Sequence, residues 1–306
     1  MSEKITKQDK IQIEEMKEKA FPECKIKKIE RLGGLTNRTF KVTFENERPK
    51  PLVFRIPGEG TEEIITRSLE EVYAKLASDN KIDAELIHFD TEGHKISEYI
   101  KPITKLDKEK AKEQKYLKEI SGVFRKLHNL DLDDNFIFDF EEEESKYINV
   151  IKKSKSFYPD GLDEISKYVH EIKDKVDGYY CGGLVPSHND PLLENWVIGE
   201  DKIYLIDWEY SGKNSRFWDL AIISEEAHFS DEDDIHLLTN YFNKTPSEEE
   251  KESILVYKIC QDYLWGLWGY ARIKFSDDEA FYKNYGDERI NLLYSNLKKY
   301  KERYGK

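Results

Sequence analysis

Cysteine and methionine are scarce in this chain, whose 306 residues include three cysteines and two methionines. Cys24, Cys181 and Cys260 are odd in number and widely spaced, so they form neither a disulfide framework nor the paired spacing of a zinc site. No stretch approaches the roughly 20 consecutive apolar residues of a membrane-spanning helix. The charged N-terminal stretch lacks the apolar segment of a signal peptide. These shortages predict a cytoplasmic protein with reduced thiols and no membrane insertion.

Basic residues are in the minority. The chain has 49 lysines and arginines against 62 aspartates and glutamates, which gives a formal net charge of −13. Because a nucleic-acid partner needs a basic face, this balance argues against one. It does not argue against a nucleotide, since a few local cations and backbone N–H groups bind phosphates. The hydrophobic content of 38% is enough for a sizeable core and too high for a disordered chain.

One stretch in the second half of the chain concentrates polar chemistry. It reads S-H-N-D-P-L-L-E-N from Ser187 to Asn195, and a short apolar run then leads to I-D-W-E at residues 206–209. Asp190 and Asn195 lie on a predicted loop, and Asp207 follows a predicted strand. Phosphoryl transfer from a nucleotide needs such a set: an Asp to accept a hydroxyl proton, and an Asn and an Asp to hold Mg²⁺. A serine hydrolase is not indicated, because neighbouring residues cannot form a triad and no G-x-S-x-G is present.

The order H-N-D-P-x-x-x-N, two strands and I-D-W-E resembles the catalytic and metal-binding segments of the choline/ethanolamine kinase family. With the aminoglycoside phosphotransferases, that family has the protein-kinase-like fold. The resemblance covers residues 26–285 with the family's motifs in order. It implies an α+β fold with an N-terminal nucleotide-binding lobe (residues 1–100), made of an antiparallel sheet and one main helix, and a larger, mostly helical lobe (residues 101–306). It also implies Asp190 as the catalytic base, and Asn195 and Asp207 as Mg²⁺ ligands, with ATP as co-substrate.

The first lobe is predicted to hold the nucleotide. Strands at residues 26–31 and 39–44 flank a glycine turn, and glycine lets backbone N–H groups approach phosphates; alone, such a hairpin is more often a plain turn. By resemblance, Arg55 on a third strand replaces the more common Lys as the phosphate-binding cation. Glu70 or its neighbour Glu71, on a helix predicted from residue 62 to 77, would orient it. The predicted ATP-binding residues are Gly33, Gly34, Thr36, Asn37, Arg55, Glu70 and, at the hinge, Glu98, Tyr99 and Ile100. The hinge stretch also fits an edge strand stopped by proline.

A helix predicted from about residue 246 to 274 carries Trp265 and Trp268, whose spacing places them on one face. Two indole rings can enclose a quaternary ammonium, and each ring contributes about 0.5–2 kcal/mol. By spacing alone, such a pair is more often part of a core. Choline kinases have W-x-x-W on this helix and a later tyrosine. The resemblance therefore implies a site for a cationic substrate made of Trp265, Trp268, Tyr285, Tyr210 and Glu226, with Glu225 as the alternative acid.

Other parts of the second lobe are predicted to be structural. Residues 108–130 have the apolar spacing of a helix, and the acidic run at 131–145 is predicted to be a solvated loop. His128 is expected to pack or cap. Asp219 is expected to cap the helix that it opens and, by resemblance, to brace the catalytic loop.

These observations predict an ATP- and Mg²⁺-dependent kinase that phosphorylates choline, with ethanolamine as a possible second acceptor. A kinase of the same fold for an aminoglycoside, a sugar or another amino alcohol is the first alternative. The second is an inactive nucleotide- or choline-binding module, against which the intact set of Asp190, Asn195 and Asp207 argues. The sequence does not rank choline against ethanolamine, and it leaves the oligomeric state open.

Overall fold

The computed structural model describes residues 5–33, 37–45, 49–58, 65–132, 136–179, 183–275 and 278–305. The chain divides into two compact units. Unit 1 consists of Met1–Leu106 and Glu194–Ser211, and unit 2 consists of Asp107–Leu193 and Gly212–Lys306. The two predicted lobes, residues 1–100 and 101–306, stay a prediction.

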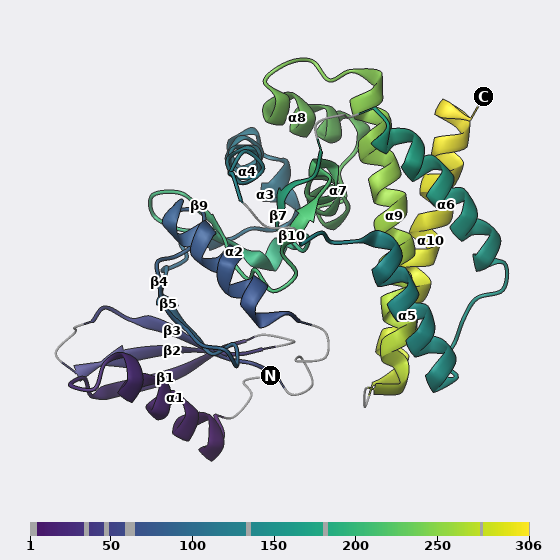
Figure 1. The fold of residues 1–306 in the computed structure, drawn as a ribbon. Coiled ribbons are helices and arrows are strands. Elements are labelled where there is room, and N and C mark those ends of the chain that lie inside the picture. The colour runs from purple at the N-terminus through teal and green to yellow at the C-terminus, as the bar shows by residue number, and fades with distance from the viewer. Residues whose placement is uncertain are drawn as a thin grey trace. The chain divides into compact units, whose positions relative to one another are not determined.

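Among the described residues, unit 1 contains a five-stranded antiparallel sheet (Figure 1). Its strands lie in the order β1 (Ile26–Gly33), β2 (Arg38–Phe44), β3 (Leu52–Ile56), β5 (Lys95–Glu98) and β4 (Leu86–Phe89). Phe40, Val42 and Phe44 alternate along β2 and are fully buried, as expected of a strand with one face on a core. Helix α1 (Lys7–Ala20) adds Ile13 and Met16 to that core. Helix α2 (Arg67–Asp79) begins later than predicted, and residues 62–64 lie outside the described residues.

A second sheet of unit 1 joins segments that are far apart in sequence. It pairs β6 (Thr104–Lys105) with β8 (Trp196–Ile198), and β8 with β9 (Ile203–Leu205). The N–H of Leu205 donates to the carbonyl oxygen of Ile82 at 3.1 Å. This sheet fixes the I-D-W-E segment against the N-terminal part of the chain.

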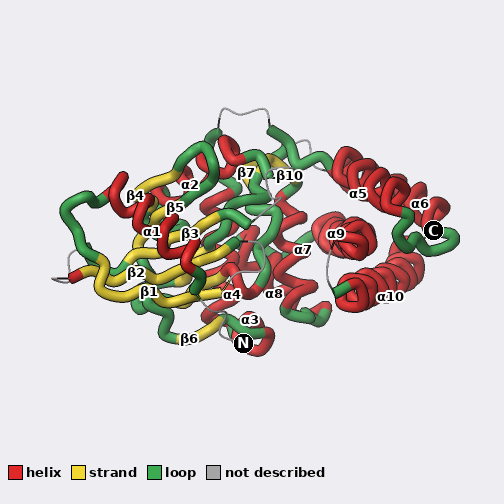
Figure 2. Tube along the Cα trace, turned by 90° about the horizontal axis from the view of Figure 1, so that it is seen from below, coloured by secondary structure: helices red, strands yellow, loops and turns green. Residues whose placement is uncertain are grey.

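Unit 2 is mostly helical. Its described helices are α3 (Lys108–Lys112), α4 (Gln114–Leu127), α5 (Phe140–Ser154), α6 (Leu162–Asp177), α7 (Arg216–Glu226), α8 (Asp231–Phe242), α9 (Glu248–Arg272) and α10 (Glu279–Tyr304). Helix α9 is buried along most of its length, and Figure 2 shows it beside α5, α6 and α10. Strands β7 (Val185–Ser187) and β10 (Gly212–Asn214) form a short antiparallel pair beside the predicted catalytic loop, which follows β7 and carries Asp190. The predicted α+β fold, with an antiparallel sheet followed by helices, is confirmed.

Two predicted elements of unit 2 are wrong in part. The acidic run is not a loop throughout, because α5 begins at Phe140. Asp139 caps this helix by accepting from the N–H groups of Glu141 and Glu142, and carboxylates in a first turn interact favourably with the helix dipole. The helix predicted over residues 108–130 is interrupted at Glu113, whose extended backbone separates α3 from α4. Within the described ranges, no helix combines the length and apolarity needed to cross a membrane.

Candidate active site

A buried polar cluster in unit 1 surrounds Arg55, which lies on β3 and is 3% exposed. Its Nη1 pairs with the Glu70 carboxylate on α2, and its Nη2 donates to the carbonyl oxygen of Gly93 at 2.9 Å. Nη1 also lies 3.4 Å from Oδ1 of Asp207. Burial opposes the charge of Arg55, but Glu70 and Asp207 hold its pKa above the ordinary value. The exposed Glu71 takes no part, so the partner of Arg55 is Glu70.

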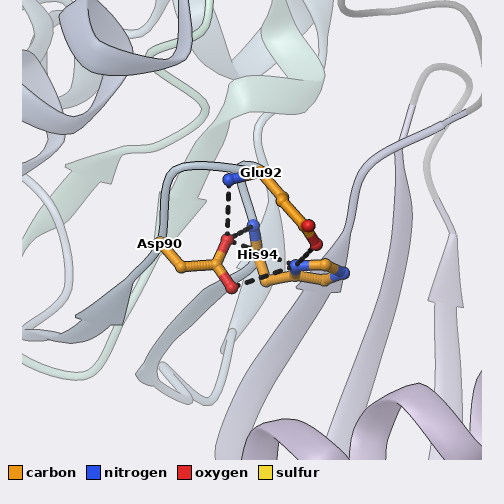
Figure 3. Close-up of side chains that lie close together, drawn as sticks. All are labelled: Asp90, Glu92 and His94. Carbon is orange, nitrogen blue, oxygen red and sulfur yellow. Dashed lines mark hydrogen bonds and ion pairs between the residues drawn. The ribbon is translucent and has the colours of Figure 1, made fainter.

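The turn that supplies this carbonyl group is organised around Asp90 (Figure 3). One oxygen of Asp90 accepts from the N–H groups of Glu92 and His94, each at 3.0 Å. The His94 ring nitrogen Nδ1 lies 3.1 Å from the other oxygen. Gly93 has a φ of +88°, and a Cβ there would lie 2.6 Å from Cδ of Arg67. The side chains of Asp90, Glu92 and His94 have the donor types of a metal site. Their contacts, however, are those of a tight turn that positions the Gly93 carbonyl group to accept from Arg55.

The predicted metal ligands flank the β8–β9 hairpin at its open end, where Trp196 pairs with Leu205. Asn195 immediately precedes β8, Asp207 follows β9, and the N–H of Ile206 donates to the carbonyl oxygen of Asn195 at 2.9 Å. Asp207 has a φ of +70°, a strained conformation for a residue with a side chain, and such strain is common at functional sites. Its side chain is 36% exposed. An amide oxygen and a partly exposed carboxylate are the hard donors that fit Mg²⁺.

Asn37 and Glu209 form a buried pair beside Asp207. The Asn37 amide Nδ2 donates to Oε2 of Glu209 at 2.8 Å. Burial and the neighbouring Asp207 charge raise the pKa of Glu209 to about 7. Asn37, predicted to bind ATP, is thus linked to the I-D-W-E segment. Gly33 is the last residue of β1, opposite Thr39. Two predicted nucleotide-loop residues lie outside the described residues, namely Gly34 and Thr36.

The predicted hinge follows β5. The N–H of Glu98 donates to the carbonyl oxygen of Glu85 at 2.9 Å, and that of Tyr99 donates to Pro51 at 3.1 Å. The N–H of Ile100 makes no hydrogen bond to any residue that the structure describes. Of the three, Ile100 is therefore the one whose N–H is not used in a hydrogen bond between described residues, and its role in binding adenine stays a prediction.

In unit 2, the predicted catalytic loop is held by Asp219, a fully buried residue of α7. Its two oxygens accept from the backbone N–H groups of His188 and Asn189, each at 2.8 Å. Asn189 has a φ of +66°, and the N–H of Asp190 lies 3.2 Å from Nδ1 of His188. A buried carboxylate thus fixes the backbone just before Asp190, the predicted base.

Asp219 does not cap its helix, so that expectation is wrong. The N-cap of α7 is Ser215, whose hydroxyl accepts from the N–H of Phe217 at 3.4 Å. Asp219 lies one turn further on and points at the loop. His128 packs beside it: Nε2 lies 3.1 Å from Asp219, and Nδ1 lies 2.7 Å from the hydroxyl of Tyr241. The predicted packing role of His128 agrees with this burial.

Three of the aromatic residues predicted to bind substrate lie together in unit 2. The Trp268 ring centroid is 6.3 Å from that of Trp265 and 5.5 Å from that of Tyr285, both edge to face. Tyr282 adds a fourth ring, 5.6 Å from Trp268. All four residues are partly exposed, unlike a closed core. Burial raises the pKa of Tyr285, and the charges of Glu226 and Asp190 add to it, so Tyr285 interacts electrostatically with the predicted base.

The two candidate acids at the end of α7 have different partners. Glu226 Oε1 lies 2.8 Å from Nη2 of Arg289, whereas Glu225 accepts from the amide of Asn296 at 3.3 Å. Which of them faces a substrate stays a prediction. Tyr210 belongs to unit 1, and its role in binding substrate also stays a prediction.

Sequence reasoning missed several residues that hold these groups in place. Trp208 is fully buried and its Nε1 donates to the buried Asp83 at 3.0 Å, which fixes the I-D-W-E segment. Arg67 pairs with Glu70 at 2.6 Å. The spacing of Arg67 and Glu70 on one helix was a usable signal for their pairing. Nothing local pointed to Asp83 or to Arg289, because their partners lie far away in sequence.

Known proteins resemble this chain over most of its length. The sequence profile described as Choline/ethanolamine kinase matches residues 27–294. Protein LicA of Haemophilus influenzae is 28% identical over 274 residues, which cover 86% of this chain and 76% of that protein. The crystal structure of the choline kinase LicA from Streptococcus pneumoniae matches with a TM-score of 0.78 and 26% identity, over 95% of this chain and 100% of that chain. An ADP-bound aminoglycoside phosphotransferase shares the fold, with a TM-score of 0.63 and 14% identity over 93% of this chain and 98% of that chain.

Proposed function

Because the chain belongs to the choline/ethanolamine kinase family, we propose that it is an ATP-dependent choline kinase. It transfers the γ-phosphoryl group of ATP to the hydroxyl of choline and gives phosphocholine, with ethanolamine as a second acceptor. The observation that carries this proposal is the partly exposed cluster of Trp265, Trp268 and Tyr285, whose tyrosine interacts electrostatically with Asp190. Aromatic faces bind a quaternary ammonium, and a nearby carboxylate suits the hydroxyl end of the same small molecule.

The nucleotide is assigned to groups of unit 1. Arg55, held by Glu70, meets the phosphates, and the backbone near Ile100 binds the adenine. A solved structure of LicA in complex with AMP, 26% identical to this chain with a TM-score of 0.76, supports an adenine nucleotide. Asn195 and Asp207 are the residues that would hold Mg²⁺, which neutralises charge on the phosphates when bound.

The acceptor is assigned to unit 2. The aromatic cluster holds the ammonium, and the Asp190 carboxylate accepts the proton of the acceptor hydroxyl. A bond forms between that oxygen and the γ-phosphorus, the bond from the γ-phosphorus to the bridging oxygen breaks, and ADP leaves. The loop geometry fixed by Asp219 keeps Asp190 in one position, so little reorganisation is needed during transfer.

A kinase for an aminoglycoside, a sugar or another amino alcohol is the competing proposal. The aromatic cluster favours a compact alkylated cation over a large polyhydroxylated acceptor, because ring faces offer no hydrogen-bond acceptors of carbonyl or carboxylate strength.

The test is an acceptor panel in a coupled assay of ADP release. The panel contains choline, ethanolamine, an aminoglycoside and a hexose, each with ATP and Mg²⁺, and a reaction without acceptor as the control. We expect acceptor-dependent ADP release with choline and with ethanolamine, and product analysis should find phosphocholine. Turnover of the aminoglycoside or the hexose, with neither amino alcohol used, would reject the proposal in favour of its competitor.

A further inference from the structure

Arg289 links the aromatic cluster to a group of buried acids. Its guanidinium carbon lies over the Tyr285 ring, 5.5 Å from the centroid. Its Nη2 donates to Glu226 at 2.8 Å, and its Nη1 lies 3.4 Å from Asp262. The side chain is 11% exposed, and Asp262 is fully buried. One cation therefore contacts a ring of the acceptor cluster and two carboxylates at once.

The crossing of α9 and α10 puts Arg289 in this position. A Cβ at Gly269 would lie 3.0 Å from the backbone nitrogen of Gly286, and a Cβ at Gly266 would lie 2.8 Å from the Ile290 side chain. The glycines let the two helices approach closely. Tyr285 and Arg289 are one turn apart on α10 and share the face that meets α9.

The acids around Arg289 already have partners within the protein. Burial raises the pKa of Asp262 well above its ordinary value, and the charge of Glu225 adds to this. The Asp262 carboxyl also accepts from the amide of Asn296 at 2.9 Å. Burial opposes the charge of Arg289, but Tyr285, Asp262 and Glu226 hold its pKa above the ordinary value, so it stays a cation. Glu226, the predicted acid for the substrate, is thus already paired.

The pairing of Arg289 with Glu226 allows the site to distinguish choline from ethanolamine, although both carry one positive charge. A guanidinium repels choline and ethanolamine alike, so charge does not distinguish them. A primary ammonium has three N–H donors that lose water on binding and need oxygen acceptors in its place, whereas a quaternary ammonium has none. Ring faces satisfy the quaternary ion without hydrogen bonds. A site whose carboxylate is occupied by Arg289 therefore favours the methylated acceptor.

Given the proposed function, we propose that Arg289 is a positioning residue that sets the preference of this site for choline over ethanolamine, by engaging Glu226 and by supporting the Tyr285 ring. The wild-type enzyme then has a kcat/KM for choline at least about tenfold above that for ethanolamine. Arg289 sets this preference through its contacts with Glu226 and Tyr285, without contacting the acceptor itself.

The test compares R289Q and R289K with the wild type by measuring kcat and KM for both acceptors and KM for ATP. In R289Q the ratio of kcat/KM for choline to that for ethanolamine falls about tenfold, mostly through KM, because Glu226 is released. R289K keeps the charge but not the two-pronged set of N–H donors. Its choline-to-ethanolamine ratio of kcat/KM therefore lies between those of R289Q and the wild type. Lys298 is 78% exposed on the same helix, so K298Q is the matched control and leaves the ratio and both KM values unchanged.

A double variant separates positioning from a general loss of structure. R289Q/E226Q removes Arg289 together with the Glu226 carboxylate that R289Q alone would free, so the acceptor ratio returns toward the wild-type value, while Asp262 keeps its hydrogen bond from Asn296. It also covers the case in which R289Q alone does not fold. Equal losses for both acceptors in R289Q and R289K would overturn the inference, as would a wild-type enzyme that prefers ethanolamine. Neither result affects the proposed kinase activity, which fails only if the wild type uses neither acceptor.

Discussion

Asp219 Oδ1 accepts a 2.8 Å hydrogen bond from the backbone N–H of Asn189, a residue held at a φ of +66°. The same carboxylate accepts from His188 with its other oxygen. A fully buried side chain thus sets the backbone of the loop that presents Asp190. In unit 1, a second buried pair holds a predicted site residue in place: Glu70 fixes the Arg55 guanidinium. These two relationships lead to the first predictions.

Replacing Asp219 by Asn should lower both activity and stability. The amide offers one oxygen to two backbone donors and carries no charge. The free energy of unfolding should therefore fall by about 3 kcal/mol and kcat by about tenfold or more. Thermal unfolding and steady-state kinetics measure the two effects. S215A is the control on the same helix: it removes the cap, which costs about 1 kcal/mol, and leaves kcat near the wild-type value. A wild-type kcat in D219N would contradict the bracing role.

Asp190→Ala should abolish transfer while ATP still binds. General-base action accounts for about 10²–10⁴-fold in rate, and Arg55 and Ile100, which are assigned to the phosphates and the adenine, lie in unit 1, far from Asp190 in sequence. ADP release measures the rate, and calorimetric titration with ATP measures binding. Asp201 contacts the Tyr204 hydroxyl at an exposed turn, so D201N is the control and keeps the wild-type rate. Near-normal turnover in D190A would remove the catalytic assignment.

Glu70→Gln should raise the KM for ATP and destabilise the protein, whereas Glu71→Gln should do neither. Glu70 is fully buried between Arg55 and Arg67, and breaking such a pair costs about 3–5 kcal/mol. Glu71 is exposed, and its substitution should change the free energy of unfolding by less than about 0.5 kcal/mol. Urea unfolding and ATP kinetics of the two neighbours test the pairing directly. Equal effects of the two substitutions would show that Glu70 is not the specific partner of Arg55.

Trp265→Ala and Trp268→Ala should each raise the KM for choline by about 2- to 30-fold and leave the KM for ATP nearly unchanged. The range follows from the loss of about 0.5–2 kcal/mol of cation–ring attraction. Tyr294 is an exposed aromatic residue of α10, so Y294A is the matched control with both KM values unchanged. An unaltered choline KM in both tryptophan variants would remove these rings from the acceptor site.

Gly286→Ala should destabilise the protein, and Gly122→Ala should stabilise it. A Cβ at position 286 would lie 2.5 Å from a ring carbon of Tyr270, and overpacking costs about 1–3 kcal/mol. Position 122 lies inside α4, and a Cβ there would have no atom within 4 Å other than those of its own helix backbone and adjacent residues. Alanine there gains about 0.5–1 kcal/mol from reduced backbone freedom. Thermal unfolding of both variants gives the signs, and a G286A variant as stable as the wild type would contradict the close crossing of α9 and α10.

Local patterns in the sequence were enough for the family, the α+β class and most of the strands. The H-N-D-P-x-x-x-N and I-D-W-E segments and the W-x-x-W pair are short motifs whose spacing can be read directly, and the family match is confirmed. The alternation of β2 and the apolar spacing of α4 are likewise properties of neighbouring residues. Local chemistry misled at residues 139–145, where a run of acids was predicted to be a solvated loop and turned out to cap and begin a helix.

Tertiary structure decided the partners. Only folding distinguished Glu70 from Glu71, brought Asn195 and Asp207 together at the open end of one hairpin, and placed the Asp219 carboxylate against the backbone of His188 and Asn189. Arg289 had no sequence signal, because its partners lie on two other helices and its pairing depends on which helix faces pack together. Hydrophobic periodicity determines which residues face a core, but buried charges find their partners only when distant elements meet, and that depends on packing.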